Sequence, residues 1–137
     1  MKIVIDTNIF ISSFFWQGNP RKVFDRVMNR LDKLYISDDI LKEIFDIMSG
    51  KKFNIDKYII DDYIKIIESF SIKIFHNNEI ESICRDADDN KILKCGLEGK
   101  VDFIITGDND LLILKEYNNI KIKNAKNYLD LIYNKEF

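Results

Sequence analysis

The chain has 137 residues, 46% of them hydrophobic, and we expect residues 1–137 to form one globular domain. Its formal net charge of −2 gives no broadly basic surface, so nucleic-acid binding would need local basic patches or bound cations. A single histidine, His76, leaves little material for a histidine-based triad or a multi-histidine zinc site. The chain lacks a long apolar run and signal-peptide features, which predicts a cytoplasmic protein without membrane contact.

The first ten residues carry the clearest functional pattern. An apolar, β-branched run ends on Asp6, followed by Thr7 and Asn8, which predicts a buried strand with a carboxylate at its end. In open α/β sheets, ligands bind at the carboxyl ends of the strands, so Asp6 is a candidate site residue. Asp is also a favoured helix N-cap, and this simpler interpretation fits Asp6 equally well.

After an apolar, aromatic segment, a helix is predicted from Pro20 to about Leu31, with Asn19 as its N-cap. On one face of this helix, basic residues recur at helical spacing: Lys22, Arg26, Arg30 and Lys33. Such a stripe is more often a solvated surface than a track for RNA phosphates, and both interpretations stay open.

A short strand at Leu34–Ile36 precedes a helix predicted from Ser37 to about Met48. Glu43 lies on the border of the apolar stripe of this helix, one turn from Ile40 and from Ile47. It can therefore point along the edge of the core toward a cleft. Periodicity alone favours the alternative, an ordinary surface glutamate.

The densest acidic cluster follows a predicted helix at about 56–70 and a predicted strand at 72–75. Asp86 or Asp88 would be the N-cap of the next helix. Asp89 shares a helical face with apolar residues and a glycine, so it should project from the buried side: Ile92, Leu93 and Gly96. An unpaired buried carboxylate is costly, and a metal ion would be a suitable partner.

The apolar run Val101–Ile105 predicts a central parallel strand. A tight turn at Gly107 would place Asp108, and with it Asp110, at another strand end. Capping of a following helix, predicted at Leu111–Glu116, would explain one of these two acids but hardly both.

An edge-like strand at 121–123 and a helix capped by Asn124 complete the pattern. Alternating strands and helices predict an α/β fold, a three-layer α/β/α sandwich with a central, mainly parallel five-stranded sheet. In that arrangement Asp6 and Asp108 follow strands, while Glu43 and Asp89 lie on helices that can lean over the same crevice. The four acids can then converge.

Carboxylates held close together repel one another, which raises some of their pKa values or requires a counter-cation. Hard oxygen ligands without Cys or His select Mg²⁺ or Mn²⁺. Such a site suits phosphodiester hydrolysis, because bound ions polarise the phosphoryl oxygen and generate a nucleophile.

Five short motifs follow one another along the chain: Val4-Ile5-Asp6-Thr7-Asn8, Gly18-Asn19-Pro20, Ser37 followed by Glu43, Asp86-Ala87-Asp88-Asp89-Asn90-Lys91, and Thr106-Gly107-Asp108-Asn109-Asp110-Leu111-Leu112. Each motif is weak by itself, whereas their order and spacing together are fairly specific. In these motifs the chain resembles PIN-domain ribonucleases, particularly the bacterial, VapC-like toxin components of toxin–antitoxin pairs.

The resemblance implies an Mg²⁺- or Mn²⁺-dependent endoribonuclease that cleaves single-stranded RNA. It places these residues at the four acidic positions of the family: Asp6, Glu43, Asp89 and Asp108. Asp110 would be an accessory metal ligand, and Asn8 and Thr106 would orient the carboxylates. Asp86 and Asp88 compete with Asp89 for the third position. The resemblance also implies a small antitoxin protein as partner and a homodimer.

Our mechanistic hypothesis is that Asp6, Asp89 and Asp108 hold the metal, while Glu43 positions the attacking water or a second ion. Two alternatives compete with it. A phosphatase of the haloacid-dehalogenase type with Asp6 as nucleophile is disfavoured, because Asn8 stands where that pattern needs a second Asp. A catalytically silent PIN-like module that binds RNA or a protein is the other alternative.

Overall fold

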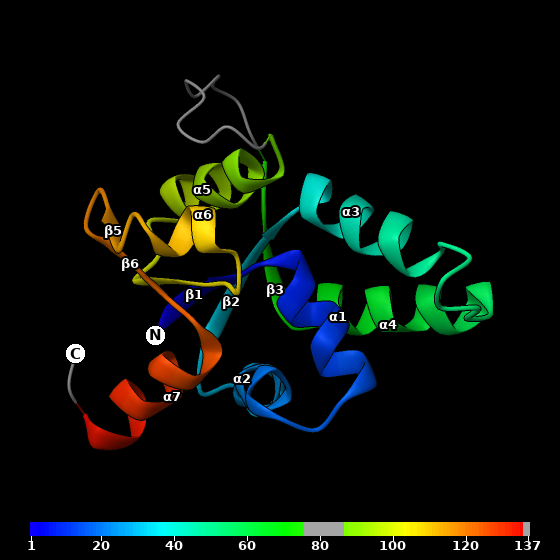
Figure 1. Cartoon of the computed structure of the whole chain (residues 1–137), viewed down its shortest axis with the longest axis horizontal. Coiled ribbons are helices and arrows are strands. Elements are labelled where there is room, and N and C mark those ends of the chain that lie inside the picture. Colours follow the sequence, from blue (N-terminus) through cyan, green and yellow to red (C-terminus); the bar gives the residue numbers. More distant parts are fainter. Residues whose placement is uncertain (76–86, 136–137) are drawn as a thin grey trace.

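A computed structural model describes residues 1–75 and 87–135, with only the backbone described for residues 87 and 88. Within these residues, a six-stranded sheet has the strand order β3-β2-β1-β4-β6-β5 (Figure 1). The strands are β1 (Lys2–Ile5), β2 (Lys33–Ser37), β3 (Ser71–Ile74), β4 (Phe103–Ile105), β5 (Glu116–Tyr117) and β6 (Ile120–Lys123). All neighbouring strands are parallel except β5, which is antiparallel to β6. The predicted α/β class with a mainly parallel sheet is confirmed.

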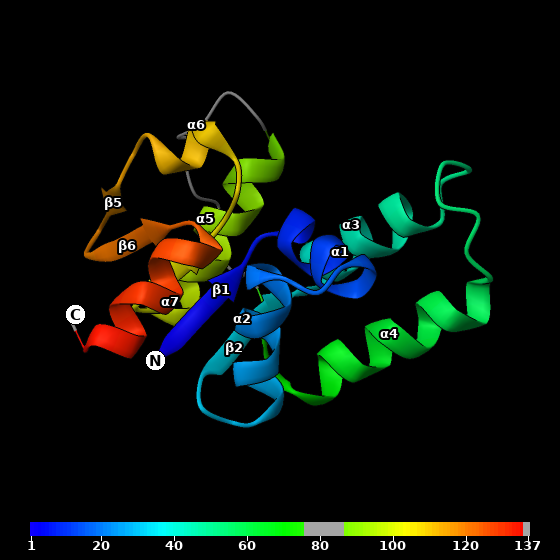
Figure 2. The same ribbon diagram turned by 60° about the horizontal axis from the view of Figure 1, so that its bottom comes forward.

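Helices cover both faces of the sheet. They are α1 (Thr7–Phe15), α2 (Asn19–Met28), α3 (Asp38–Met48), α4 (Lys57–Ser69), α5 (Ala87–Gly99), α6 (Asn109–Leu112) and α7 (Ala125–Asn134). Helices α2 and α7 pack together on one face, and α5 lies on the other (Figures 1 and 2). Helices α3 and α4 pair and extend to the right in Figure 1. Among the described residues, no helix is both long enough and apolar enough to cross a membrane.

The carboxyl ends of the two central strands, β1 and β4, position the candidate site residues. Strands β1 and β4 are neighbours, and Ile3, Val4 and Ile5 face Phe103, Ile104 and Ile105 in register, all of them buried. Such continuous burial is typical of a parallel strand covered on both faces. The ladder continues one step further, since the amide of Asp6 donates to the carbonyl of Ile105 at 2.9 Å. Asp6 and Thr106 therefore leave the sheet side by side.

The sheet has one strand more than the sequence predicted. Asn118 and Asn119 adopt left-handed φ angles of 48° and 68°, which close a two-residue hairpin between β5 and β6. Strand β6 is therefore paired on both sides and is not the edge strand that its lysines suggested. The helix predicted at Leu111–Glu116 is shortened to α6, because the chain turns into β5 instead.

Helix α2 differs from its predicted course. It has Gly18, and not Asn19, as its N-cap. The helix ends at Met28, because Arg30 adopts a left-handed φ of 60° and the amide of Leu31 donates back to the carbonyl of Arg26. Leu31, the predicted end of this helix, lies outside it and is 59% exposed. The helix predicted at about 56–70 is α4, in which Ile60, Tyr63 and Ile67 form the buried face. Tyr58 and Ile66 are exposed.

Candidate metal centre

Asp6 both caps a helix and contacts the neighbouring strand end. Its Oδ1 accepts the amide of Thr7 at 2.7 Å, as an N-cap of α1, and its Oδ2 accepts the hydroxyl of Thr106 at 2.6 Å. The side chain is buried, with 6% of the residue exposed. The N-cap interpretation of Asp6 is therefore confirmed, while its second oxygen contacts the residue that follows β4, and its role as a site residue stays a prediction.

Thr106 connects the two strand ends. Its hydroxyl donates to Asp6 and accepts the amide of Asp108 at 3.0 Å, while the residue itself is fully buried. The predicted role of Thr106 in orienting the carboxylates stays a prediction. Asn8 lies in the first turn of α1 with an exposed side chain, and its orienting role stays a prediction.

Asp108 and Asp110 both have a local structural role. Asp108 is the N-cap of α6 and accepts the amide of Asp110 at 2.8 Å, and Asp110 lies in the first turn of that helix. Acids are favoured at both positions, so the expectation that local structure explains only one of them is wrong. Their side chains nevertheless remain beside the strand end, where a third acid meets them.

That third acid is Asp89 of α5, which is 3% exposed on the face that packs against the sheet. One carboxylate oxygen from each of Asp89, Asp108 and Asp110 lies within 4.8 Å of the other two. Three carboxylate oxygens so close together match the hard donor set that Mg²⁺ and Mn²⁺ prefer. The residues present therefore fit a divalent cation. Thr106 links Asp6 to this group, because its hydroxyl donates to Asp6 and accepts the amide of Asp108. The role of Asp6 as a metal ligand stays a prediction.

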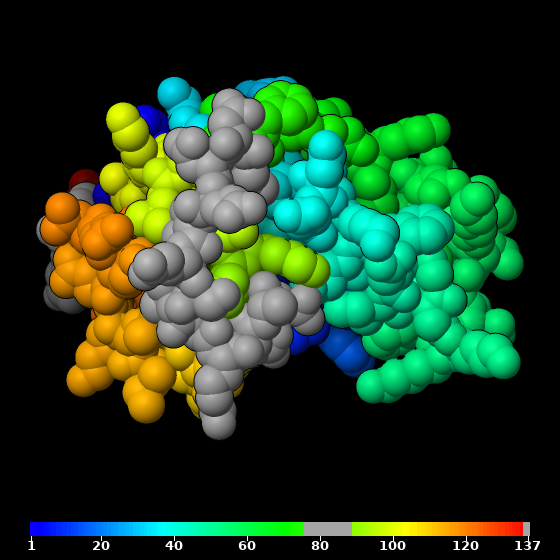
Figure 3. All heavy atoms as spheres, turned by 90° about the horizontal axis from the view of Figure 1, so that it is seen from above, coloured from blue at the N-terminus to red at the C-terminus, as the bar shows by residue number. Residues whose placement is uncertain are grey.

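Glu43 contacts a lysine of α5. Its Oε2 lies 3.5 Å from Nζ of Lys91, and the two side chains are 14% and 35% exposed respectively. Helix α3 lies beside α5 on the face seen from above in Figure 3. A catalytic role for Glu43 stays a prediction. Asp86, predicted to compete for the third acidic position, lies outside the described residues, as does the side chain of Asp88.

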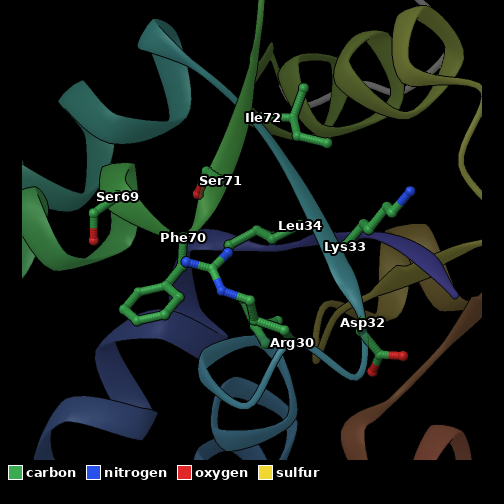
Figure 4. A pocket seen from close by; sticks show the side chains of 9 residues that line it. Arg30, Asp32, Lys33, Leu34, Ser69, Phe70, Ser71 and Ile72 are labelled. Carbon is green, nitrogen blue, oxygen red and sulfur yellow. The ribbon is translucent and has the colours of Figure 1, made fainter.

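The predicted basic stripe is not one continuous face. Arg26 forms an ion pair with buried Asp32, at 2.8 Å between Nε and Oδ2. The guanidinium of Arg26 is therefore engaged in a contact within the fold. Arg30 lies outside α2, and its guanidinium stacks 5.0 Å from the ring centroid of Phe70 (Figure 4). Lys22 and Lys33 are exposed. Because α2 ends at Met28, the four basic residues between Lys22 and Lys33 do not share one helical face.

Arg30 and Lys33 line a cavity of about 260 Å³ at the other end of the sheet. Lys33 of β2 is paired with Lys2 of β1. Lys2 lies four residues before Asp6, and four residues span about 13 Å along a strand. Arg30 and Lys33 therefore lie at the amino ends of the strands, whereas the acids lie at the carboxyl ends. Contact of Lys22, Arg30 or Lys33 with RNA stays a prediction.

The family model for the PIN domain matches residues 2–110. The chain belongs to the PIN-domain family. It is 40% identical over 131 residues to an uncharacterized protein of Methanocaldococcus jannaschii, MJ1680, covering 90% of this chain and 82% of that protein. The fold of this chain is also similar to that in the crystal structure of VapBC2 from Rickettsia felis bound to a DNA fragment from their promoter. That match has a TM-score of 0.61 and 17% identity, and it covers 90% of this chain and 98% of the other.

The sequence analysis of this PIN domain did not predict one contact and one buried polar group. The pairing of Glu43 with Lys91 joins residues 48 positions apart, and a single sequence holds no signal for it. The hydroxyl of Thr7 is buried and finds no hydrogen-bond partner among the residues that the structure describes. Cys95 is buried, which raises the pKa of its thiol to about 12 and keeps it protonated.

Proposed function

We propose that this PIN domain is a metal-dependent endoribonuclease that cleaves phosphodiester bonds of single-stranded RNA and acts as the toxin of a toxin–antitoxin pair. The observation that carries the proposal is the meeting of Asp89, Asp108 and Asp110, whose carboxylate oxygens lie within 4.8 Å of one another. Family membership supports it, because the acids that meet belong to the motifs that resemble PIN-domain ribonucleases.

The residues would share the work as follows. Asp89, Asp108 and Asp110 would hold Mg²⁺ or Mn²⁺, with Asp6 as a further ligand kept in place by Thr106. A divalent cation bound there supplies Lewis-acid polarisation of the phosphodiester and a more acidic water. Burial of Asp6 and Asp89 keeps their carboxylates fixed, so little reorganisation is needed when substrate arrives.

Cleavage of a labelled single-stranded RNA with Mn²⁺, and its loss on adding EDTA, tests the proposal. Asp108→Asn should abolish cleavage while preserving the fold, because asparagine caps a helix as well as aspartate does and can still accept the amide of Asp110. Asp6→Asn should also abolish cleavage. The exposed Asp46→Asn on α3 serves as the control and should cleave like the wild type.

Cleavage that persists in Asp108→Asn at undiminished rate would contradict the proposal. RNA binding without metal-dependent cleavage in the wild type would instead favour a silent binding module. A single-stranded DNA of the same sequence, run in parallel, identifies a DNA nuclease.

The toxin role has its own support and test. The solved neighbour comes from a VapBC2 complex, and the sequence resemblance implies a small antitoxin and a homodimer. Induced expression in bacteria should arrest growth and degrade RNA, whereas Asp108→Asn should do neither. Light scattering on the purified chain checks the dimer.

A further inference from the structure

Lys91 lies on the same helix as Asp89, and the proposed function gives it no role. It lies two residues after Asp89 on α5, and its Nζ is 3.5 Å from Oε2 of Glu43 on α3. Two residues along a helix correspond to a rotation of about 200°, so Asp89 and Lys91 leave α5 in different directions. Asp89 turns inward, and Lys91 reaches across to α3.

We propose that Lys91 contacts a phosphate of the bound RNA at the acidic site, and that Glu43 is the positioning residue that holds its ammonium there. This inference rests on the proposed function and names a phosphate-binding residue for the same site. It also gives Glu43 a different task from the one expected from the sequence, where it positioned water or a second ion.

The exposures of the two side chains support this assignment. Glu43 is only 14% exposed, so its carboxylate is the inner member of the pair, while Lys91 is 35% exposed and forms the outer member. An incoming RNA strand therefore meets the ammonium before the carboxylate. An ammonium has three N–H donors and can bond a carboxylate and a phosphate oxygen at the same time.

The negative charge of the acidic site also favours a cation that contacts the RNA phosphate. The site joins three carboxylates within 4.8 Å, and together with Asp6 and Glu43 these acids repel a phosphodiester that approaches them. One divalent ion offsets only part of this charge. A lysine fixed at the rim would add attraction where the substrate enters, and an ion pair with Glu43 would keep its flexible side chain from leaving the site.

The first experiment measures binding of a fluorescent single-stranded RNA in the presence of Ca²⁺, which takes the same oxygen ligands as Mg²⁺. Lys91→Ala should weaken binding about tenfold or more, the usual effect of losing a hydrogen bond to a charged group. It should also flatten the salt dependence of the affinity. Lys91→Arg should restore most of the affinity, and the exposed Lys65→Ala on α4 should bind like the wild type.

The second experiment separates the two roles open to Glu43. If Glu43 acts through Lys91, Glu43→Gln should weaken RNA binding in the wild-type background and add nothing in the Lys91→Ala background. The affinity for Mn²⁺ without RNA, measured by electron paramagnetic resonance of the free ion, should change by no more than about twofold in either variant. A large loss of Mn²⁺ affinity in Glu43→Gln with unchanged RNA binding would overturn the inference and make Glu43 a metal ligand.

Failure of this inference differs from failure of the proposed function. Wild-type protein that cleaves RNA, with a Lys91→Ala variant that binds RNA like the wild type, overturns the role of Lys91 alone. Wild-type protein that shows no metal-dependent cleavage overturns the nuclease itself.

Discussion

Asp32 carries a buried negative charge at the amino ends of the strands, far along β1 from Asp6. The residue is 4% exposed, and its Oδ2 accepts hydrogen bonds from Arg26 and Tyr128, both at 2.8 Å. Burial alone would raise the pKa of Asp32, but the hydrogen bonds from Arg26 and Tyr128 and the charge of Arg26 outweigh it and lower the pKa. Asp32 and Arg26 therefore stabilise the fold, which explains why Arg26 does not continue the basic stripe on the surface.

Asp32→Asn should lower the free energy of unfolding by about 3–5 kcal/mol, because it leaves Arg26 without its partner in a buried site. The exposed Asp130→Asn on α7 removes only a surface pair with Lys126 and should cost less than about 1 kcal/mol. Urea denaturation at neutral pH measures both. Equal effects of the two substitutions would show that the Asp32 cluster contributes no more than a surface ion pair.

The pH dependence of this contribution has a definite sign. The pKa of Asp32 is lower in the folded chain than its ordinary value of 3.8, so the folded state binds the proton more weakly than the unfolded state. The stabilisation is therefore complete above the unfolded pKa and is lost as the pH falls through the folded pKa. The difference in unfolding free energy between wild type and Asp32→Asn should stay constant from pH 7 to about 5 and shrink below about pH 4. A difference that does not shrink on acidification would contradict this origin.

The position of helix α5 decides whether Asp89 meets Asp108 and Asp110. The helix carries Asp89 and packs on the sheet with Gly96 seven residues later on the same face. A Cβ at Gly96 would lie 3.0 Å from Cδ1 of Ile104 and 3.4 Å from Cδ1 of Ile120. The glycine therefore permits the close approach of α5 to β4 and β6 that brings Asp89 to Asp108.

Gly96→Val should test this close packing. The added side chain must push α5 away from Ile104, and overpacking of this kind costs about 1–3 kcal/mol. The matched control is Lys94→Val on the same helix, which introduces the same residue at a half-buried position and should cost only about 0.5 kcal/mol. Because Asp89 moves with the helix, Gly96→Val should also weaken Mn²⁺ binding, measured by isothermal titration calorimetry. Equal stability and equal Mn²⁺ affinity in the two variants would exclude the packing role of Gly96.

The elements also show what a single sequence reveals. Hydrophobic periodicity predicted the inward direction of Asp89, and the cap pattern at Asn124 predicted α7, since both depend on neighbours within one or two turns. The hairpin between β5 and β6 was missed because an Asn-Asn turn resembles an ordinary loop. The pairing of Arg26 with Asp32 and that of Lys91 with Glu43 were missed for another reason: partners of this kind are chosen by tertiary packing.

For the whole molecule, the acidic site joins parts of the chain that are remote in sequence. Asp108 and Asp110 follow β4, and Asp89 lies on α5, which comes between β3 and β4 in the sequence. Asp6, which accepts a hydrogen bond from Thr106, follows β1. The parallel order of the sheet brings these strand ends together, as the sequence analysis expected. A cation bound there would link α5 to the carboxyl edge of the sheet, so metal binding and folding should be coupled.

Millimolar Mn²⁺ should therefore raise the melting temperature of the wild type. A ligand present at 100 times its Kd that binds only the folded chain stabilises it by about 2.7 kcal/mol, which corresponds to roughly 5–10 °C for a domain of this size. Asp110→Asn should reduce the shift, because it removes one of the three carboxylates and leaves the backbone hydrogen bond to Asp108 intact. Asp130→Asn should keep the full shift. Differential scanning calorimetry at constant ionic strength measures all three proteins, and an unshifted wild type at saturating Mn²⁺ would rule out a preformed cation site.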